Sequence, residues 1–573
     1  LSNPLDVTLT GCDFLQNHAG TSGGGIYLHD ASTVTTITGC LFSEDDADDY
    51  GGAIYIDSGP TDVVDCTFTS CWCTEDGGAA YITGAGPVTF LRCGFDLNTA
   101  ASGGGIAAYA LPALSLQDCT FESNGATHFG GGLLCDNLGL LSVNRCDFLT
   151  NTAQHGDGGG IFTDSTTTAV DSCLFQGNHA GEPHGGGGMW ASAGDDDITN
   201  CLFWENTGYR GGSLRLYDCV ADTIRSCTFS DNQAELSGGG ARVGGGAYFF
   251  HNCSFTRNGA VNAGGIYCAN ATLDVMGGIF YGNIAKEGVI SPTCMGGGIH
   301  SPGNSDISIT GSLFANDSAA AGGCLAMRGY GTLDMRSTSI YACHALREEC
   351  ASGLYLDDDI QGTAERTIIS YGTQGEAVHC APDLLTLTCC DLYGNVDGDW
   401  TGSIAGQYGV DGNISEDPLF CDPSGGAPDY DFGYYFGLHS DSPCAPFSDP
   451  NPECDLIGAF VVACGPASAE DPASPIGPTL LLRHSPNPVH RAARITYTVP
   501  YALGAPTANV HLAIYDASGR LVRCLVDEEQ VVGIHGVSWD GTDSGHQTTS
   551  SGVYFCRLQV GSASMVQSVI RIE

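Results

Sequence analysis

The chain has 573 residues, and its 65 Asp and Glu against 19 Lys and Arg give a formal net charge of −46 at pH 7. Lys286 is the only lysine, so the composition excludes the basic face that nucleic-acid binding needs and disfavours adsorption to an anionic membrane. No run of 18 apolar residues occurs, so we expect no transmembrane segment.

From the first residues to about 330, one phrase recurs every 26 to 28 residues. A Cys-x-Phe step is followed by Asn, a few polar residues, a glycine run and an aliphatic residue, and Cys12, Phe14, Asn17 and residues 23–26 form the first copy. The phenylalanines that mark this period are Phe14, Phe42, Phe68, Phe95, Phe121, Phe148, Phe175, Phe203, Phe229 and Phe255. A fixed period is typical of a solenoid, in which each repeat buries its apolar face against its neighbours.

Within a repeat, apolar and polar residues alternate over short runs such as 12–14, 25–28 and 33–38. This pattern predicts three short strands in each coil and no long helices. Strands of this length, at ~3.3 Å per residue, suit a parallel β-helix, and parallel crossovers are right-handed almost without exception. We therefore predict an all-β chain with a right-handed parallel β-helix over residues 1–400.

Coils stacked in register place equivalent residues ~4.8 Å apart, in columns. The Phe column should fill the interior by offset stacking. Each repeat's Asn should bond the amide in the next coil and adopt left-handed backbone. Ten cysteines precede the Phe by two residues, and we predict that they stay free thiols because this spacing exceeds the usual disulfide range.

A further column should point outward beside the buried aliphatic residues. It reads Tyr27, Tyr55, Tyr81, Ala107, Leu134, Phe162, Trp190, Arg215, Tyr267, His300 and Tyr355. Tyr27, Tyr55, Tyr81, Phe162, Trp190 and Tyr267 are the candidate binding residues, because an aromatic strip on a solvent face can stack on sugar rings or contact a partner. The alternative is that cross-strand stacking only stabilises the sheet.

Two metal sites are conceivable. His155, Asp157, His179 and His184 fall in turns of neighbouring coils, where imidazole and carboxylate groups suit a transition metal ion. The alternative is polar turn residues that face water. Acidic runs at 45–46, 48–49, 195–197 and 357–359 are expected in loops, where they keep a long rod soluble or bind Ca²⁺.

Catalysis is disfavoured by the placing of the acidic residues. β-Helix lyases and hydrolases need carboxylates clustered on one sheet, and we expect no pair of Asp at equivalent strand positions of neighbouring coils. A non-enzymatic structural or adhesive protein is therefore favoured, and a polysaccharide lyase or hydrolase is the alternative. The first coil begins within about ten residues of the chain start, so the end of the solenoid would present unpaired strand edges that can pair with another copy. We therefore also expect the chain to assemble with itself, head to tail, into a filament.

Beyond the repeats, residues 401–466 form a loop-rich terminus and residues 467–482 a Pro-rich linker. Alternating runs at 495–499, 510–515, 521–526, 536–539 and 553–560 predict a small Ig-like β-sandwich over 483–573. The disulfide candidates are Cys421, Cys444, Cys454 and Cys464 in the terminus, with Cys524 and Cys556 in the sandwich. Bridges there would indicate an oxidising compartment.

Two resemblances accompany these patterns. Over about residues 1–330 the alternation of GGA[ILV] with FxxN resembles the repeats of chlamydial polymorphic membrane proteins, which implies a right-handed β-helix. Residues 485–488, 514–516, 518–522, 537–541 and 551–555 resemble the Ig-like domain of flagellar hook-capping proteins and the C-terminal sorting domain of type IX secretion. The second resemblance implies export, so we expect an extracellular or cell-surface bacterial protein that contacts itself, a surface glycan or another protein.

Overall fold

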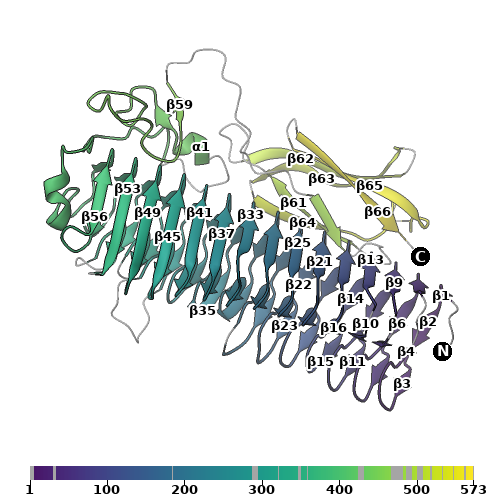
Figure 1. Cartoon of the computed structure of the whole chain (residues 1–573). Coiled ribbons are helices and arrows are strands. Elements are labelled where there is room, and N and C mark those ends of the chain that lie inside the picture. Colours follow the sequence, from purple (N-terminus) through teal and green to yellow (C-terminus); the bar gives the residue numbers. More distant parts are fainter. Residues whose placement is uncertain are drawn as a thin grey trace.

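The structure is a computed structural model. It describes residues 6–29, 34–57, 59–84, 86–183, 185–286, 295–319, 322–345, 350–357, 359–423, 432–465, 482–485, 493–499, 507–516, 519–531, 533–545, 547–560 and 563–571. Most of the predicted linker, residues 287–294 and His184 therefore lie outside the described residues. Figure 1 shows the solenoid as a row of stacked coils that runs from β1 (Val7–Thr10) to β56 (Leu385–Thr388).

Each regular coil contains four strands, one more than the sequence predicts. In the second coil these are β5 (Thr35–Thr38), β6 (Leu41–Ser43), β7 (Asp46–Ala47) and β8 (Ile54–Asp57). The extra element is β7, a two-residue strand that follows the Asn turn and is too short to leave a periodic signal. Equivalent strands of successive coils pair in parallel and build four sheets along the rod.

We number the sheets 1 to 4 in the order that the chain visits them. Among the described residues, sheet 1 has 15 strands from β1 to β56, and sheet 2 has 15 from β2 (Asp13–Leu15) to β57 (Asp391–Tyr393). Sheet 3 has 13 strands from β3 (His18–Ala19) to β51 (His344–Ala345). The 14 strands of sheet 4 are β4 (Ile26–His29), β8, β12 (Ala80–Thr83), β16 (Ile106–Tyr109), β20 (Leu133–Asp136), β24 (Ile161–Asp164), β28 (Met189–Ser192), β32 (Leu214–Tyr217), β36 (Ala241–Gly244), β40 (Ile266–Ala269), β44 (Ile299–Ser301), β48 (Leu325–Met327), β52 (Leu354–Leu356) and β55 (Val378–His379).

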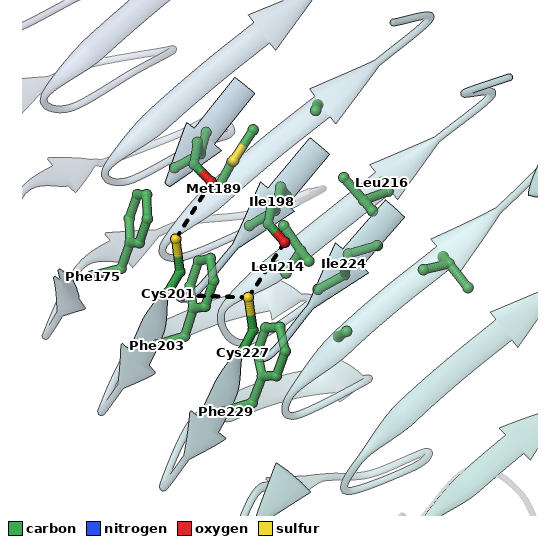
Figure 2. Close-up of a cluster of buried hydrophobic side chains, with 14 of the residues drawn as sticks. Phe175, Met189, Ile198, Cys201, Phe203, Leu214, Leu216, Ile224, Cys227 and Phe229 are labelled. Atoms are coloured by element: carbon green, nitrogen blue, oxygen red, sulfur yellow. Dashed lines mark hydrogen bonds between the residues drawn. The ribbon is translucent and has the colours of Figure 1, made fainter. Parts of the chain in front are cut away.

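The coils stack in register, as predicted. Phe14 pairs with Phe42, and each later Phe of the repeat lies over the next one. Phe175, Phe203 and Phe229 illustrate the resulting stack (Figure 2), with ring centroids 4.6 and 4.9 Å apart and nearly parallel planes. These rings are fully buried, so the column forms one continuous wall of the hydrophobic core.

The ten repeat cysteines are free thiols in the structure, which confirms that prediction. The backbone N–H of Cys201 donates to Sγ of Cys227 over 3.4 Å, and that thiol lies 3.5 Å from the carbonyl oxygen of Ile198 (Figure 2). Burial raises the pKa of both thiols. These two thiols are therefore neutral at physiological pH, and they pack like small hydrophobic residues.

The asparagine column is a hydrogen-bonded ladder inside the turn. Asn151 accepts bonds from the backbone N–H and the side-chain amide of Asn124, both 3.0 Å long, and donates to Asn178 and to the carbonyl oxygen of Phe121. The left-handed backbone lies one residue earlier, at Thr150 with φ 52°, so the prediction that Asn itself adopts it is wrong. The Asn side chain must point inward to join the ladder. The left-handed backbone that makes the turn therefore falls on the preceding residue, which points outward.

Two of the acidic runs, 45–46 and 195–197, lie partly in strands, whereas residues 48–49 and Asp357 lie outside strands as predicted. Asp196 begins β29 (Asp196–Thr199) and is buried, whereas its neighbours Asp195 and Asp197 are exposed. Asp45 is buried as well, because it occupies an Asn position of the ladder and accepts the side-chain amide of Asn17. Alternate residues of a strand face opposite sides, so a run of acids on a strand sends every second one into the core.

The terminus after the last coil contains the 3₁₀ helix η1 (Gly402–Gln407), the helix α1 (Phe432–Tyr435), β58 (Leu438–His439) and β59 (Val462–Cys464). Cys421 pairs with Cys464, and Cys454 pairs with Cys389 of the last coils. A third bridge joins Cys324 to Cys343. Cys444 stays a free thiol, contrary to prediction, because its Sγ lies against the carboxylate of Asp391 at 3.1 Å.

The C-terminal unit has seven described strands in two antiparallel sheets, which is the expected Ig-like sandwich. One sheet contains β60 (Leu482–Ser485), β61 (Ala493–Val499) and β64 (Gly533–Trp539); the other contains β62 (Thr507–Asp516), β63 (Leu521–Val531), β65 (Gly552–Val560) and β66 (Ala563–Arg571). Cys524 and Cys556 are free thiols. They lie on β63 and β65, which flank β62 on opposite sides, so about two strand spacings separate them and the predicted bridge does not form.

None of the helices in the described part of the chain is long and apolar enough to cross a membrane.

Candidate functional site

The outer face of sheet 4 gathers the aromatic residues predicted to bind a ligand. In each four-residue strand the first and third side chains point into the core and the second and fourth point outward, as Ile26 and Leu28 are buried while Tyr27 and His29 are exposed. The second positions form outer column 1, which reads Tyr27, Tyr55, Tyr81, Ala107, Leu134, Phe162, Trp190, Arg215, Arg242, Tyr267, His300, Ala326, Tyr355 and His379. All six predicted binding residues therefore lie in one column.

The first three residues of outer column 1 form a tyrosine ladder. The rings of Tyr27 and Tyr55 stack with centroids 4.8 Å apart, and those of Tyr55 and Tyr81 with centroids 5.2 Å apart. Stacking covers the ring faces, so a sugar can lie flat only on the free face of a terminal ring. The ladder instead offers ring edges and a row of hydroxyl groups, and Tyr27 is 50% exposed.

Two small or buried residues, Ala107 and Leu134, interrupt the aromatic column. It resumes at Phe162 and Trp190, whose rings stack at 4.5 Å with planes 2° apart. Both are half-buried, and the ring of Phe129 lies 4.9 Å from Phe162. The indole Nε1 of Trp190 is buried and has no hydrogen-bond partner in the described part of the chain, so it is an unsatisfied donor beneath this face.

Two arginines follow Trp190 in outer column 1. The sequence pattern predicted Arg215 there, but the prediction left out Arg242. Arg215 follows Trp190 in the register, then Arg242, whose guanidinium lies 4.8 Å from the ring centroid of Tyr267. Arg242 directly follows a glycine run and an alanine, Gly238 to Ala241. Arg242 occupies the same position in its repeat as Tyr27, which follows residues 23–26. The repeat period was therefore enough to place Arg242 in the column.

The fourth positions of the strands form outer column 2, which includes Tyr109, Asp136, Asp164, Ser192 and Tyr217. Asp136 and Asp164 occupy the same position in adjacent coils, so the expectation that no such pair exists is wrong. The sequence pattern does not reveal this pair. Each Asp is the last residue of its strand, and in the sequence it looks like part of the following turn. Ser192 Oγ donates to Asp164, and burial together with the charge of Asp164 raises the pKa of Asp136.

Of the predicted transition-metal site, His155 and His179 do not form a group of ligand atoms with Asp157 among the described residues. His155 and His179 are exposed, and His179 Nδ1 lies 2.8 Å from the hydroxyl of Thr207. Asp157 is buried and accepts the backbone N–H of Gly185 over 2.7 Å. Because His184 lies outside the described residues, this metal site stays a prediction, as does Ca²⁺ binding.

Three other groups in the described part of the chain place ligand atoms within 4.8 Å of one another. Asp317, Cys324 and Cys343 include a disulfide and offer no thiolate. Asp196, Cys219 and Asp222 are enclosed in the core, where burial and mutual charge raise the pKa of Asp196 to about 8. His511, Cys524 and Asp527 lie on the outside of the sandwich. None of these groups adjoins the outer face of sheet 4.

Comparisons with known proteins agree with both halves of this architecture. Residues 2–181 match the family model of the right handed beta helix region, and residues 492–564 match that of the FlgD Ig-like domain. The chain thus joins a right-handed parallel β-helix to a C-terminal FlgD Ig-like domain, as the sequence predicted. No curated protein matches the chain.

Two solved structures of phage tailspikes resemble the chain weakly. The enzymatically active domain of tailspike protein 4 from bacteriophage CBA120 shares 12% identity with a TM-score of 0.26, covering 86% of this chain and 63% of its own. The tailspike protein of E. coli bacteriophage HK620, in complex with pentasaccharide, shares 12% identity with a TM-score of 0.26, covering 100% of this chain and 87% of its own. Our chain therefore spans less than two thirds of the first structure, and likeness at this level says nothing of activity.

Proposed function

We propose that the protein is an exported, non-enzymatic binding rod that holds a surface saccharide along the outer face of sheet 4. The observation that carries this proposal is outer column 1, in which aromatic and arginine side chains occupy one register position over many coils. A linear saccharide is the ligand whose repeating shape suits a repeating face. Phenol hydroxyls and ring edges offer the mixture of polar and apolar contacts that sugars need.

Export is supported by two independent features. Three disulfides are formed among the described cysteines, and such bridges persist in oxidising compartments outside the cytoplasm. The FlgD Ig-like domain resembles the Ig-like domain of flagellar hook-capping proteins and the sorting domain of type IX secretion, which belong to exported assemblies. Together they support a location outside the cell, where a surface glycan would be the natural ligand.

The tyrosine ladder provides the direct test. Replacing Tyr27, Tyr55 and Tyr81 together with Ser removes three ring edges and hydroxyls from the proposed surface and leaves the core aliphatic residues in place. We expect at least a tenfold loss of affinity for whichever saccharide binds the whole chain on a glycan array, measured by calorimetry.

A control variant removes exposed apolar side chains elsewhere. Trp72 lies on β11 (Trp72–Cys73) of sheet 3 and Leu15 on β2 of sheet 2, and both are exposed. The double change to Ser should leave binding intact. Equal binding by the tyrosine triple variant and the parent would contradict the proposal.

One specific observation favours a second function, glycoside hydrolysis. Asp136 and Asp164 sit ~4.8 Å apart by strand spacing, close to the ~5 Å that separates the two carboxyl groups of retaining glycosidases. The raised pKa of Asp136 suits an acid, and the Ser192 hydroxyl holds Asp164 in place. Reducing ends released from a polysaccharide panel, and lost in Asp136→Asn and Asp164→Asn but not in Asp62→Asn on sheet 1, would establish it.

A further inference from the structure

Three arginines converge at the centre of the outer face of sheet 4. Arg215 and Arg242 are neighbours in outer column 1, and Arg210 ends β31 (Thr207–Arg210) of sheet 3, in the turn that leads to Arg215. The positive charges of Arg242 and Arg210 both lower the pKa of Arg215, in addition to the larger effect of burial. Like charges this close repel one another, so the cluster needs a negative partner.

The chain itself supplies no carboxylate ion pair to these three arginines in its described part. Elsewhere on the solenoid, Arg92, Arg145, Arg225 and Arg257 each pair with an aspartate of a neighbouring coil. In the cluster, Nε of Arg210 and both Nε and Nη1 of Arg215 are buried without a hydrogen-bond partner. Arg215 is 6% exposed. Buried charged donors without acceptors are rare, because desolvation penalises them strongly.

In the described part of the chain, Asp157 is the carboxylate that raises the pKa of Arg215, against the larger lowering by burial, and it does not neutralise the cluster. Its oxygen Oδ1 is taken by the backbone N–H of Gly185, and a single carboxylate opposes three guanidinium groups. Burial lowers the pKa of Arg215 to about 10 against the opposing effect of Asp157. The guanidinium therefore remains charged at neutral pH, and the cluster keeps an excess of positive charge in a chain that is otherwise strongly acidic.

Aromatic side chains frame the arginines on the same face. Trp190 precedes Arg215 in the column with its indole N–H unpaired, and Tyr267 follows Arg242. Tyr217, in outer column 2 beside Arg215, is 45% exposed. A ligand that fits this surface carries an acid group over the guanidinium groups and a ring against the aromatic residues.

We infer that Arg210, Arg215 and Arg242, with Trp190 and Tyr267, form a binding site for an acidic sugar residue, a pyranose that bears a carboxylate or a sulfate. Arg210 and Arg242 are half-buried and can contact the acid group directly, while Arg215 lies beneath them and supplies charge. The inference deepens the proposed function, on which its saccharide part rests. It makes the acid group, and not the tyrosine ladder, the main determinant of specificity.

The test compares hexasaccharides of one length with the whole chain. Calorimetry in a buffer free of sulfate and phosphate measures binding of neutral chitohexaose, of hyaluronan hexasaccharide with carboxylates, and of chondroitin 4-sulfate hexasaccharide with both acid groups. Sodium acetate and sodium sulfate serve as the small-ion probes. We expect at least one acidic hexasaccharide to bind tenfold or more tightly than chitohexaose, with an affinity that falls as NaCl is added.

Variants assign the effect to the cluster. Arg242→Gln and Arg210→Gln should each weaken binding of the acidic hexasaccharide at least tenfold and flatten its salt dependence. Arg145→Gln is the matched control, because Arg145 is a solenoid arginine that bonds Asp118 and lies away from sheet 4. Arg215→Met, which removes an unpaired buried charge and keeps the apolar stem, should weaken binding while the thermal midpoint holds or rises.

The outcomes separate this inference from the proposed function. Equal affinity for neutral and acidic hexasaccharides, or unchanged binding by Arg242→Gln and Arg210→Gln, overturns the inference and leaves the proposed function standing. Arginine-dependent binding of sulfate or acetate, with no hexasaccharide bound, overturns the acidic-sugar assignment and the proposed function together. Acid-selective binding that is lost in the glutamine variants and kept in Arg145→Gln supports both.

Discussion

At the scale of single residues, the solenoid is specified by what each side chain does for the coil beside it. An interior asparagine satisfies two donors of one neighbour and uses an acceptor of the next, so its contribution exceeds that of one ordinary hydrogen bond. A cysteine, in contrast, is tolerated because it is small and its buried thiol stays protonated. Position within the repeat therefore decides which substitutions the fold can accept.

Removing one ladder amide should be costly. In Asn151→Ala, two N–H donors of Asn124 lose their shared acceptor and the carbonyl oxygen of Phe121 loses a donor. We expect the free energy of unfolding to fall by about 2 to 4 kcal/mol, measured by urea denaturation. Thr152→Ala, one residue along and without a side-chain bond in the described contacts, should change it by less than about 0.5 kcal/mol; comparable effects would contradict the ladder's role.

Asp317 ends the ladder in place of Asn and should make stability depend on pH. Burial raises the pKa of its carboxyl to about 8, against the opposing bonds from Asn283. The folded state therefore holds a proton that the unfolded state releases near pH 4, and stability falls as pH rises from about 4 to 8. Asp317→Asn should reduce this slope, to which the buried carboxyl of Asp196 also contributes, and stabilise the protein at pH 8, as thermal midpoints between pH 5 and 9 will show; a parallel pH profile in the variant would disprove the assignment.

A structural feature could be predicted from the sequence when it uses one residue type at a fixed period. The Phe, Cys and Asn columns were predicted because each uses one residue type at a fixed period. Arg242 and the Asp136–Asp164 pair were missed because outward positions change residue type from coil to coil. The two-residue strands of sheet 3 and the left-handed residue before each Asn were not predicted, because neither is marked by a particular residue type.

At the scale of elements, sheet 4 differs from the other sheets in what it exposes. Its inward positions are mostly aliphatic, whereas its outward columns change along the rod from tyrosines to aspartates and arginines. Stability requires only the inward pattern, so the outward variation is free to serve binding. The terminus shows the opposite balance, since it has little core of its own and relies on crosslinks.

The Cys421–Cys464 bridge should hold this terminus together. It closes a loop of 43 residues, for which chain entropy gives about 4 kcal/mol of stabilisation. Cys421→Ser should increase hydrogen exchange over residues 432–465 and leave exchange in the Phe-column strands unchanged. Faster exchange throughout the solenoid, or none in the terminus, would contradict the division between a core-stabilised rod and a crosslinked end.

At the scale of the whole molecule, the solenoid buries its thiols in one continuous core. Among the described free cysteines Cys524 is exposed and Cys12 is half-buried, and the others are buried. Native labelling with a thiol reagent should therefore modify Cys524 first, and the repeat cysteines from Cys40 to Cys253 only after unfolding. Mass spectrometry of labelled peptides checks this, and rapid labelling of the mid-rod cysteines would contradict in-register stacking. Head-to-tail assembly stays a prediction, which sedimentation of the whole chain addresses separately.

The central claim is that the outer face of sheet 4 is the ligand-binding face of this rod. Hydrogen exchange of the whole chain with and without hyaluronan or chondroitin 4-sulfate hexasaccharide tests it most directly. We predict protection confined to the strands of sheet 4 and strongest in β28, β32, β36 and β40, which contain Trp190, Arg215, Arg242 and Tyr267. Protection confined to sheet 1 or sheet 2, or to the Ig-like strands between 493 and 571, would contradict the claim.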